Sequence, residues 1–348
     1  MARSVAELLQ VDESHRDLGW LEEALQHALE LEFATIPVYL SALWSIKNPP
    51  PDPPPPDSAF GLIQGIAFEE MLHLGLVCNM LTTLGATPHI IKGIPSYPRK
   101  GLPGGVQPDL RVTLAGLTKD RVANLFMQIE YPEYDVPGTT PPRRAADDYA
   151  TIGNFYDAIE KTFKRLKPPV TGERQLTATF DAEKLTQIKD SAAFVHAIRT
   201  IKDQGEGTSR GDPDAGPEFG NELAHYFKFG SLYWGKLYVK GPDRKWGYNG
   251  EAIPFPDVYP MMEVPAGGYV NPAAPVRKAL DAFNACFTTV VKKLDEAWSK
   301  GDAKALNAAI TAMFDLGGLA APLYGFKVPR TSHTYGPTFE LDPQPAAA

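Results

Sequence analysis

The fold is decided by the stretch Glu70-Met71-Leu72-His73, which has a twin at Glu222-Leu223-Ala224-His225. A Glu and a His three positions apart lie on the same face of a helix, one turn from each other. Two such pairs on facing helices, joined by one Glu from each of two further helices, form a dinuclear metal site inside a bundle. The two stretches therefore predict an all-α, metal-binding four-helix bundle, with two iron atoms as the first expectation.

The spacing alone is suggestive and needs support from its surroundings. The chain has 20 Glu and 7 His among 348 residues. At these frequencies about 0.4 matches to the Glu-x-x-His spacing of two-iron bundles arise by chance. Two matches exceed that number, but the residues around them have to carry the prediction.

Composition narrows the class of protein. The net charge is −8 and the pI is about 5.5, which argues against nucleic acid and anionic membrane as partners, because both need a basic surface. The two Cys, Cys78 and Cys286, lie in apolar helical patterns and do not predict a disulfide. No apolar N-terminal core of the signal-peptide type and no apolar run of about 18 residues occurs, so we expect a cytoplasmic protein.

The first bundle helix is predicted over residues 16–47. Leu25, Leu29, Glu32 and Ile36 fall on one apolar stripe at helical spacing. A carboxylate on a buried stripe needs a partner, because burying an unpaired charge is costly. Metal ligation supplies such a partner for Glu32. An Arg partner or a solvated cleft is the alternative.

The second bundle helix is predicted over residues 58–85 and is apolar on nearly every side, so we expect it at the centre of the bundle. Its only ionisable side chains are Glu69, Glu70 and His73. A lone His on such a helix is more often a core residue than a ligand. With Glu70 one turn before it, His73 is better interpreted as a metal ligand.

The remaining elements follow from periodicity and from the positions of Pro and Gly. Residues 1–330 are expected to form one elaborated domain, followed by an extended tail at 331–348. Within this domain we expect the following elements: an insertion over 88–145 with a short strand near Asp109 and a helix over Thr118–Glu130, a helix over 147–166, bundle helices over 190–206 and 218–234, and a C-terminal helical pair over 275–317.

The fourth carboxylate is the least certain ligand. Glu206 neighbours polar residues, which favours a solvated helix end, but it lies between Gly205 and Gly207 and stands 16 residues before Glu222. The flanking glycines free its direction from the helical stripe. Glu160 is the competing candidate.

Several ordered motifs resemble one family, the iminophenyl-pyruvate dimer synthases of bisindole pigment biosynthesis, and in particular their ferritin-like domain. The motifs are the stretch Leu31-Glu32-Phe33-Ala34-Thr35-Ile36-Pro37-Val38-Tyr39-Leu40, Glu70-Met71-Leu72-His73, Leu102-Pro103-Gly104-Gly105, Ile129-Glu130-Tyr131-Pro132-Glu133, Gln204-Gly205-Glu206-Gly207 and Glu222-Leu223-Ala224-His225. The resemblance covers about residues 16–320. It implies a ferritin-like bundle with Glu32, Glu70, His73, Glu206, Glu222 and His225 as metal ligands, and it places Glu206 ahead of Glu160.

Four Glu and two His suit two iron ions, with manganese as the second choice. A dinuclear site of this kind predicts an oxidoreductase that uses dioxygen or peroxide on a small organic substrate, and the resemblance suggests an aryl-pyruvate imine. The open alternatives are an iron-binding protein without an organic substrate, a manganese catalase-like enzyme and a non-catalytic scaffold. The sequence leaves open whether a haem is also bound and whether the chain forms a homo-oligomer.

Overall fold

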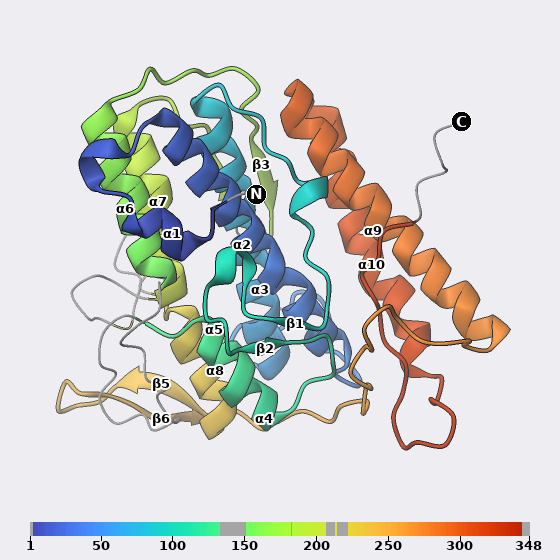
Figure 1. Cartoon of the computed structure of the whole chain (residues 1–348). Coiled ribbons are helices and arrows are strands. Elements are labelled where there is room, and N and C mark those ends of the chain that lie inside the picture. The colour runs from blue at the N-terminus through green and yellow to red at the C-terminus, as the bar shows by residue number, and fades with distance from the viewer. Residues whose placement is uncertain (1–2, 133–150, 182, 207–212, 214–221, 343–348) are drawn as a thin grey trace, which may run out of the picture.

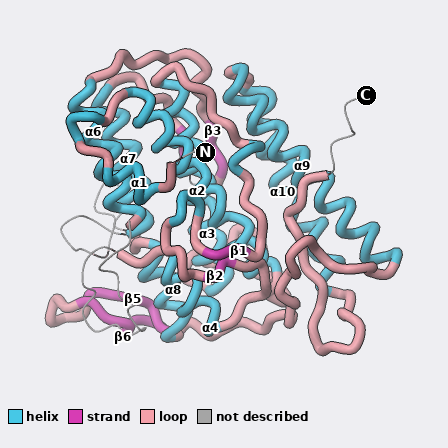
Figure 2. The backbone as a smooth tube through the Cα atoms, in the orientation of Figure 1, coloured by secondary structure: helices cyan, strands magenta, loops and turns pink. Residues whose placement is uncertain are grey.

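The computed structural model describes residues 3–132, 151–181, 183–206, 213 and 222–342. Helices dominate these residues, and the strands form three two-stranded antiparallel pairs (Figure 2). The mainly α-helical architecture expected from the sequence is confirmed. The helices are α1 Val5–Gln10, α2 Leu18–Trp44, α3 Ala59–Thr83, α4 Lys119–Arg121, α5 Met127–Ile129, α6 Ile152–Leu166, α7 Ser191–Glu206, α8 His225–Trp234, α9 Ala274–Lys300 and α10 Ala303–Tyr324.

The strand pairs are small and lie outside the bundle. They are β1 Arg99–Lys100 with β2 Arg111–Val112, β3 Ala178–Phe180 with β4 Glu183–Leu185, and β5 Lys236–Lys240 with β6 Trp246–Ala252. The short strand expected near Asp109 corresponds to β2.

Helices α2 and α3 form the centre of the molecule (Figure 1). Asp17 caps α2 by accepting a hydrogen bond from the Trp20 backbone N–H at 2.9 Å, and Ser58 caps α3 by accepting one from the Gly61 N–H at 3.0 Å. Most side chains of both helices are buried. Neighbours on every side therefore explain why α3 is apolar around its whole circumference.

The other two corners of the bundle each consist of two shorter segments. At one end of the bundle α6 packs on α2 and α7, and Phe163 stacks on Phe194 with ring centroids 3.7 Å apart. At the other end Tyr39 of α2 contacts Phe126 and Phe229, which belong to the segment before α5 and to α8. These two corners are therefore divided, with α6 and α7 at one end of the bundle and α5 and α8 at the other end.

Two predicted helices differ from the structure. The helix expected at 218–234 begins at His225, because Ala224 has extended backbone angles. The helix expected at Thr118–Glu130 is divided into α4, a π-helical turn at Val122–Phe126 and α5. The parts of the predicted elements that fall on 133–150 and 214–221 lie outside the described residues.

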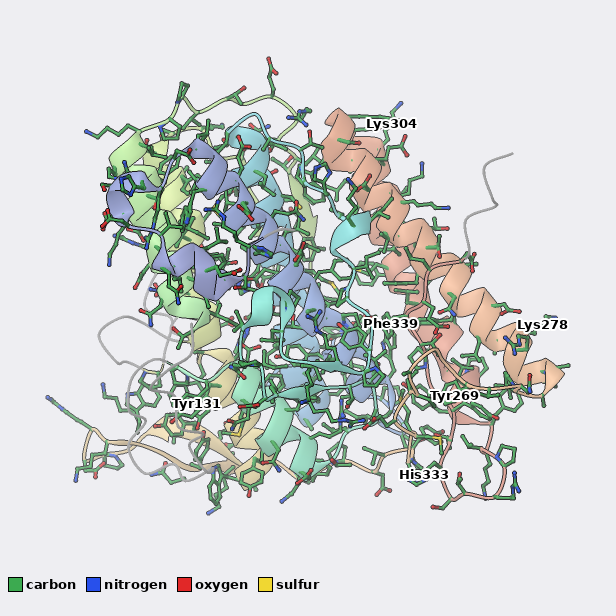
Figure 3. All side chains as sticks on the ribbon, in the orientation of Figure 1. Tyr131, Tyr269, Lys278, Lys304, His333 and Phe339 are labelled. Carbon is green, nitrogen blue, oxygen red and sulfur yellow. The ribbon has the colours of Figure 1, made fainter. Side chains whose placement is uncertain are left out.

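The C-terminal helical pair is confirmed, with α10 continuing to Tyr324. Helices α9 and α10 pack mainly on each other and stand beside the bundle in Figure 1. The tail has no helix or strand between 331 and 342 and packs onto the protein, with Phe339 buried against Phe283 and Phe287 (Figure 3). The single-domain boundary at residue 330 stays a prediction.

Two helices, α3 and α10, have the length and mean hydropathy of a membrane span. The apolar window of α3 is 72% buried inside the protein and that of α10 is 28% buried. Burial explains the composition of α3, since core helices of globular proteins pass the same criterion. The cytoplasmic location stays a prediction.

Candidate metal centre

A cluster of buried acidic and imidazole side chains lies between α2, α3 and the helix ends at α5 and α8. Glu32 comes from the middle of α2, and Glu70 and His73 come from successive turns of α3. Glu130 directly follows α5, and His225 is the first residue of α8. All five residues are at most 6% exposed.

The first group of candidate ligands is Glu32, Glu70 and His73, whose ligand atoms lie within 4.8 Å of one another. His73 Nδ1 is 3.5 Å from Glu32 Oε2. The Glu70/His73 pair is helical, as predicted, so both side chains leave the same face of α3.

The second group is Glu70, Glu130 and His225. His225 Nδ1 lies 2.9 Å from Glu70 Oε1 and 3.4 Å from Glu130 Oε2. Glu70 belongs to both groups, which is the position of a bridging carboxylate in a dinuclear site. The imidazole rings of His73 and His225 are nearly parallel, with centroids 5.7 Å apart.

Three hydroxyl groups hold the carboxylates from outside. Tyr156 donates to Glu32 Oε1 at 2.5 Å, Thr35 donates to Glu70 Oε2 at 2.9 Å, and Tyr39 donates to Glu130. Burial and the charge of Glu130 hold the pKa of Tyr39 well above its usual value, and burial and Glu32 do the same for Tyr156. Both phenols therefore remain donors at neutral pH.

The Nε2 atoms of the two imidazoles have different hydrogen-bond partners. His73 Nε2 lies 2.8 Å from the Gln204 amide oxygen, and His225 Nε2 lies 2.7 Å from Glu69 Oε2. In both rings Nδ1 faces the carboxylates and Nε2 faces an acceptor. With a metal ion at Nδ1, each ring would keep its proton on Nε2 and donate it to that acceptor.

Lys228, one turn after His225, neutralises Glu69. Its ammonium group lies 2.6 and 2.9 Å from the two oxygens of that carboxylate. Burial opposes ionisation of Glu69, but Lys228 and His225 outweigh it and hold the Glu69 pKa far below its usual value. The pair lets a carboxylate stand next to the cluster without adding net charge.

The charges inside the cluster are poorly compensated by the protein alone. Burial and the charge of Glu130 raise the pKa of Glu70 to about 7. Burial opposes protonation of His225, but Glu130, Glu69 and Glu70 together hold its pKa well above its usual value. Three carboxylates within one buried site need added positive charge, from protons or from cations.

The residues fit a pair of metal ions. His225 Nδ1 is buried and has no hydrogen-bond partner of ordinary geometry among the described residues, although it faces two carboxylates. Each group offers one imidazole nitrogen and at least two carboxylates, a donor set that suits iron and manganese. The structure does not distinguish between these metals.

Four of the ligands predicted from the sequence are brought together: Glu32, Glu70, His73 and His225. Glu222 is not among them. It precedes α8, its side chain is 61% exposed, and it accepts a hydrogen bond from Lys228 at 3.1 Å. The prediction of a helical Glu222/His225 pair is therefore wrong, because the helix begins only at His225.

The two candidates for a fourth carboxylate have different outcomes. Glu160 lies in α6, pairs with Lys164 and belongs to neither group. The side chain of Glu206 lies outside the described residues, so its role as a ligand stays a prediction. Its neighbour Gly205 lines the cavity at the cluster, and a Cβ on Gly205 would stand 3.7 Å from Glu130 Oε2.

Sequence patterns did not predict two functional residues. Glu130 is a candidate ligand, and Glu69 is the partner that orients His225. Glu130 was visible as the last residue of a predicted helix and as part of the motif Ile129-Glu130-Tyr131-Pro132-Glu133. Glu130 ends a short, irregular helix, so no apolar stripe at helical spacing predicted that its side chain is buried.

A cavity of about 440 Å³, including its part open to solvent, reaches the cluster. Leu31, Ile129, Ile152 and Ile201 form apolar walls next to the carboxylates. Lys202 is the only cationic side chain among the described lining residues and pairs with Asp157 at 2.5 Å.

Comparison with known proteins agrees with this geometry. The chain is 26% identical to dichlorochromopyrrolate synthase of Lentzea aerocolonigenes over 325 residues, which cover 82% of this chain and 30% of that protein. The chain thus spans less than a third of this curated relative. A crystal structure of a ferritin-like protein from Caulobacter vibrioides superimposes with a TM-score of 0.62 at 27% identity, covering 92% of this chain and 97% of that one.

Residues 25–234 match the ferritin-like family. This range is more than half of the chain and contains most of α2, all of α3 and every candidate ligand. The protein is a member of the ferritin-like family.

Proposed function

We propose that the protein is a dinuclear metal-dependent oxidoreductase, with iron as the first choice of metal, that uses dioxygen or peroxide on a small organic substrate. The observation that carries this proposal is Glu70, which belongs to two buried groups that each add their own Glu and their own imidazole. Two metals that share a carboxylate can bind both ends of a small oxidant.

When bound, such metals supply electrons to the oxidant and positive charge to the buried carboxylates. The protein's own residues keep the ligands in place. Tyr156, Thr35 and Tyr39 orient the three carboxylates, while Gln204 and Glu69 orient the two imidazoles. Rigid ligands in a nearly dry site keep the geometry fixed while the charge on the cluster changes.

The substrate class is proposed from the cavity and from the relative. Apolar walls beside the carboxylates suit an aromatic side chain, and Lys202, which pairs with Asp157, would exchange that partner for a substrate carboxylate. The relative is a synthase of a dichlorochromopyrrolate. An aryl-pyruvate imine combines an aromatic ring with a carboxylate and is our proposed substrate.

The test is oxidant consumption by the iron-loaded protein. The protein is loaded anaerobically with Fe(II), and dioxygen or hydrogen peroxide is added with and without an aryl-pyruvate imine. We expect oxidant consumption that depends on the substrate and yields a coupled or otherwise oxidised product.

The variant Glu70→Ala, which removes the shared ligand, should lose this activity, and Glu160→Gln, at a residue that belongs to neither group, should keep it. Peroxide disproportionation without substrate would instead indicate a catalase. Absence of any turnover in the fully loaded protein would contradict the proposal.

A further inference from the structure

A second cavity lies between the α2–α3 hairpin and the α9–α10 hairpin. It measures about 710 Å³, including its open mouth. Phe33 and Pro37 of α2, Met71 of α3, Phe287 of α9 and Met313 of α10 contribute to its wall. Among the described residues none lines both this cavity and the one at the metal cluster.

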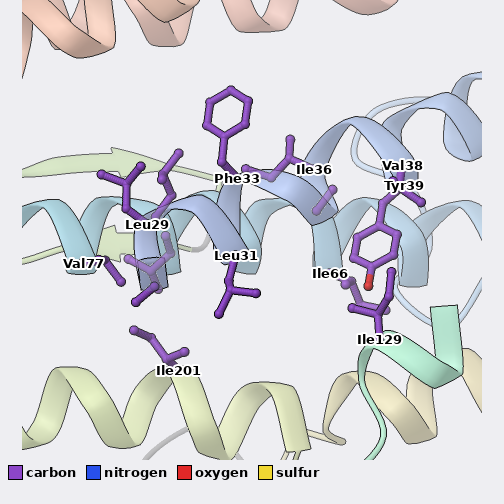
Figure 4. Packing of buried hydrophobic residues seen from close by; sticks show 14 of the residues in the cluster. Leu29, Leu31, Phe33, Ile36, Val38, Tyr39, Ile66, Val77, Ile129 and Ile201 are labelled. Atoms are coloured by element: carbon purple, nitrogen blue, oxygen red, sulfur yellow. The ribbon is translucent and has the colours of Figure 1, made fainter. Parts of the chain in front are cut away.

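The two cavities lie on different faces of α2. Figure 4 shows Leu31 directed from α2 toward α7, and Phe33, two residues later, directed away from it toward the C-terminal helices. Leu31 lines the cavity at the cluster and Phe33 lines the second cavity. The second cavity is therefore separate from the candidate metal centre.

Two aromatic pairs contribute to the contact between the two hairpins. Phe33 meets Phe287 with centroids 6.4 Å apart, and Phe68 meets Phe314 at 6.0 Å. The side chain of Phe314 is 56% exposed, so this ring pair also extends the apolar surface to the outside of α10.

The wall of this cavity has almost no hydrogen-bond donors or acceptors for water. All described lining residues are apolar, and the Trp298 indole N–H already donates to Asn79 Oδ1 at 2.9 Å. A water molecule in a cavity needs two to four polar partners, so an apolar cavity of this kind stays dry. A dry cavity in contact with solvent through an apolar mouth favours an apolar occupant.

We propose that this cavity binds a neutral, apolar small molecule such as an aromatic or aliphatic hydrocarbon, independently of the metal centre. The wall joins side chains of α2, α3, α9 and α10 around one apolar space. Met71 and Met313 come from opposite walls, and their flexible thioether side chains can adapt to ligands of different shape. Charged and hydrogen-bonding ligands are disfavoured, because the wall leaves their polar groups unpaired.

The test compares two ligands of nearly the same shape, p-xylene and p-cresol, which differ by a methyl and a hydroxyl group. Binding to the full-length protein is measured by calorimetry and by the shift of the thermal unfolding midpoint. We expect saturable binding of p-xylene. The affinity for p-cresol should be lower by a factor of about ten or more, because its hydroxyl group loses its hydrogen bonds to water. No saturable binding of p-xylene, or equal affinities, would overturn the proposal.

The location is tested with a filled cavity. Ala178, in β3, lines the cavity, whereas Ala308 lies on the exposed face of α10 and does not. Ala178→Phe should abolish p-xylene binding and keep the metal content, and Ala308→Phe should change neither. Undiminished binding by a folded Ala178→Phe protein would place the ligand elsewhere.

Xenon-pressurised crystals of the unaltered protein provide a measurement that does not depend on folding of the variant. We expect an anomalous peak between Met71 and Phe287. Xenon peaks confined to other places would reject this cavity as the site.

Discussion

Lys228 is a buried cation whose removal has a predictable cost. It bonds both oxygens of Glu69, which is 3% exposed. Lys228→Met leaves this carboxylate buried without its cation, which should lower the free energy of unfolding by about 3–5 kcal/mol. The double variant Glu69→Gln/Lys228→Met should recover most of the loss in urea unfolding. A loss in the double variant equal to that of Lys228→Met would show that the charge pair is not the cause.

Glu130 and Glu222 are predicted to differ in metal binding. Glu130 is buried in the second group, and Glu222 is largely exposed. Glu130→Gln should reduce the bound metal from two ions to about one, because the second group loses a charged ligand. Glu222→Gln should retain both ions. Elemental analysis after metal loading checks both variants, and the reverse pattern would restore Glu222 as the ligand.

Glu183, the first residue of β4, should make stability depend on pH. Burial and the charge of Glu69 raise its pKa to about 7, above the model-peptide value of 4.5. The folded protein therefore binds more protons than the unfolded chain between these values, and stability falls as the pH rises from about 4.5 through 7. In metal-free protein, Glu183→Gln should raise the thermal midpoint at pH 8 and leave it nearly unchanged at pH 5.

The matched control for this variant is the exposed Glu173, where the same replacement should have no effect at either pH. A gain for Glu183→Gln that is the same at pH 5 and pH 8 would contradict ionisation as the cause.

The residues that could be predicted from the sequence are those on long regular helices. Glu32 stands on an apolar stripe, and Glu70 with His73 stands on a helix that is apolar all round, so each had a visible reason to be a ligand. Glu130 follows a π-helical turn, which shifts the phase of the side chains. Periodicity therefore could not identify it.

The start of α3 depends on a close backbone approach. A Cβ on Gly61 would stand 2.2 Å from the Pro55 carbonyl oxygen, whereas a Cβ on Gly65, one turn later, would meet nothing within 4 Å. Gly61→Ala should therefore destabilise the protein by about 1–3 kcal/mol because the proline turn has to move. Gly65→Ala should stabilise it by up to about 1 kcal/mol, the difference in helix propensity. Urea unfolding of both variants is the measurement, and a stabilising Gly61→Ala would show that this approach is not needed.

The long helices and the C-terminal pair were predictable because their apolar residues repeat over many turns. The start of α8 was not. Glu222-Leu223-Ala224-His225 has the spacing of a helical pair, but Ala224 is extended and the chain becomes helical only at His225. The sequence pattern also did not predict that short helices, α6 and α7 at one end and α5 and α8 at the other, would complete the bundle.

In the whole molecule, the candidate metal centre lies between the continuous helices α2 and α3 and the helix ends that carry Glu130 and His225. Helix ends place Glu130, Gln204 and His225 close together, while α2 and α3 supply the remaining ligands. The C-terminal hairpin covers the other face of α2 and encloses the apolar cavity. The proposed oxidation chemistry and the proposed apolar binding thus lie on separate faces of the same central hairpin.

The most direct test of the central claim is anomalous diffraction at the iron and manganese edges from crystals of the metal-loaded protein. We predict two peaks, one among Glu32, Glu70 and His73 and one among Glu70, Glu130 and His225, with Glu70 contacting both. A metal-loaded protein with no anomalous peak at these residues would contradict the account.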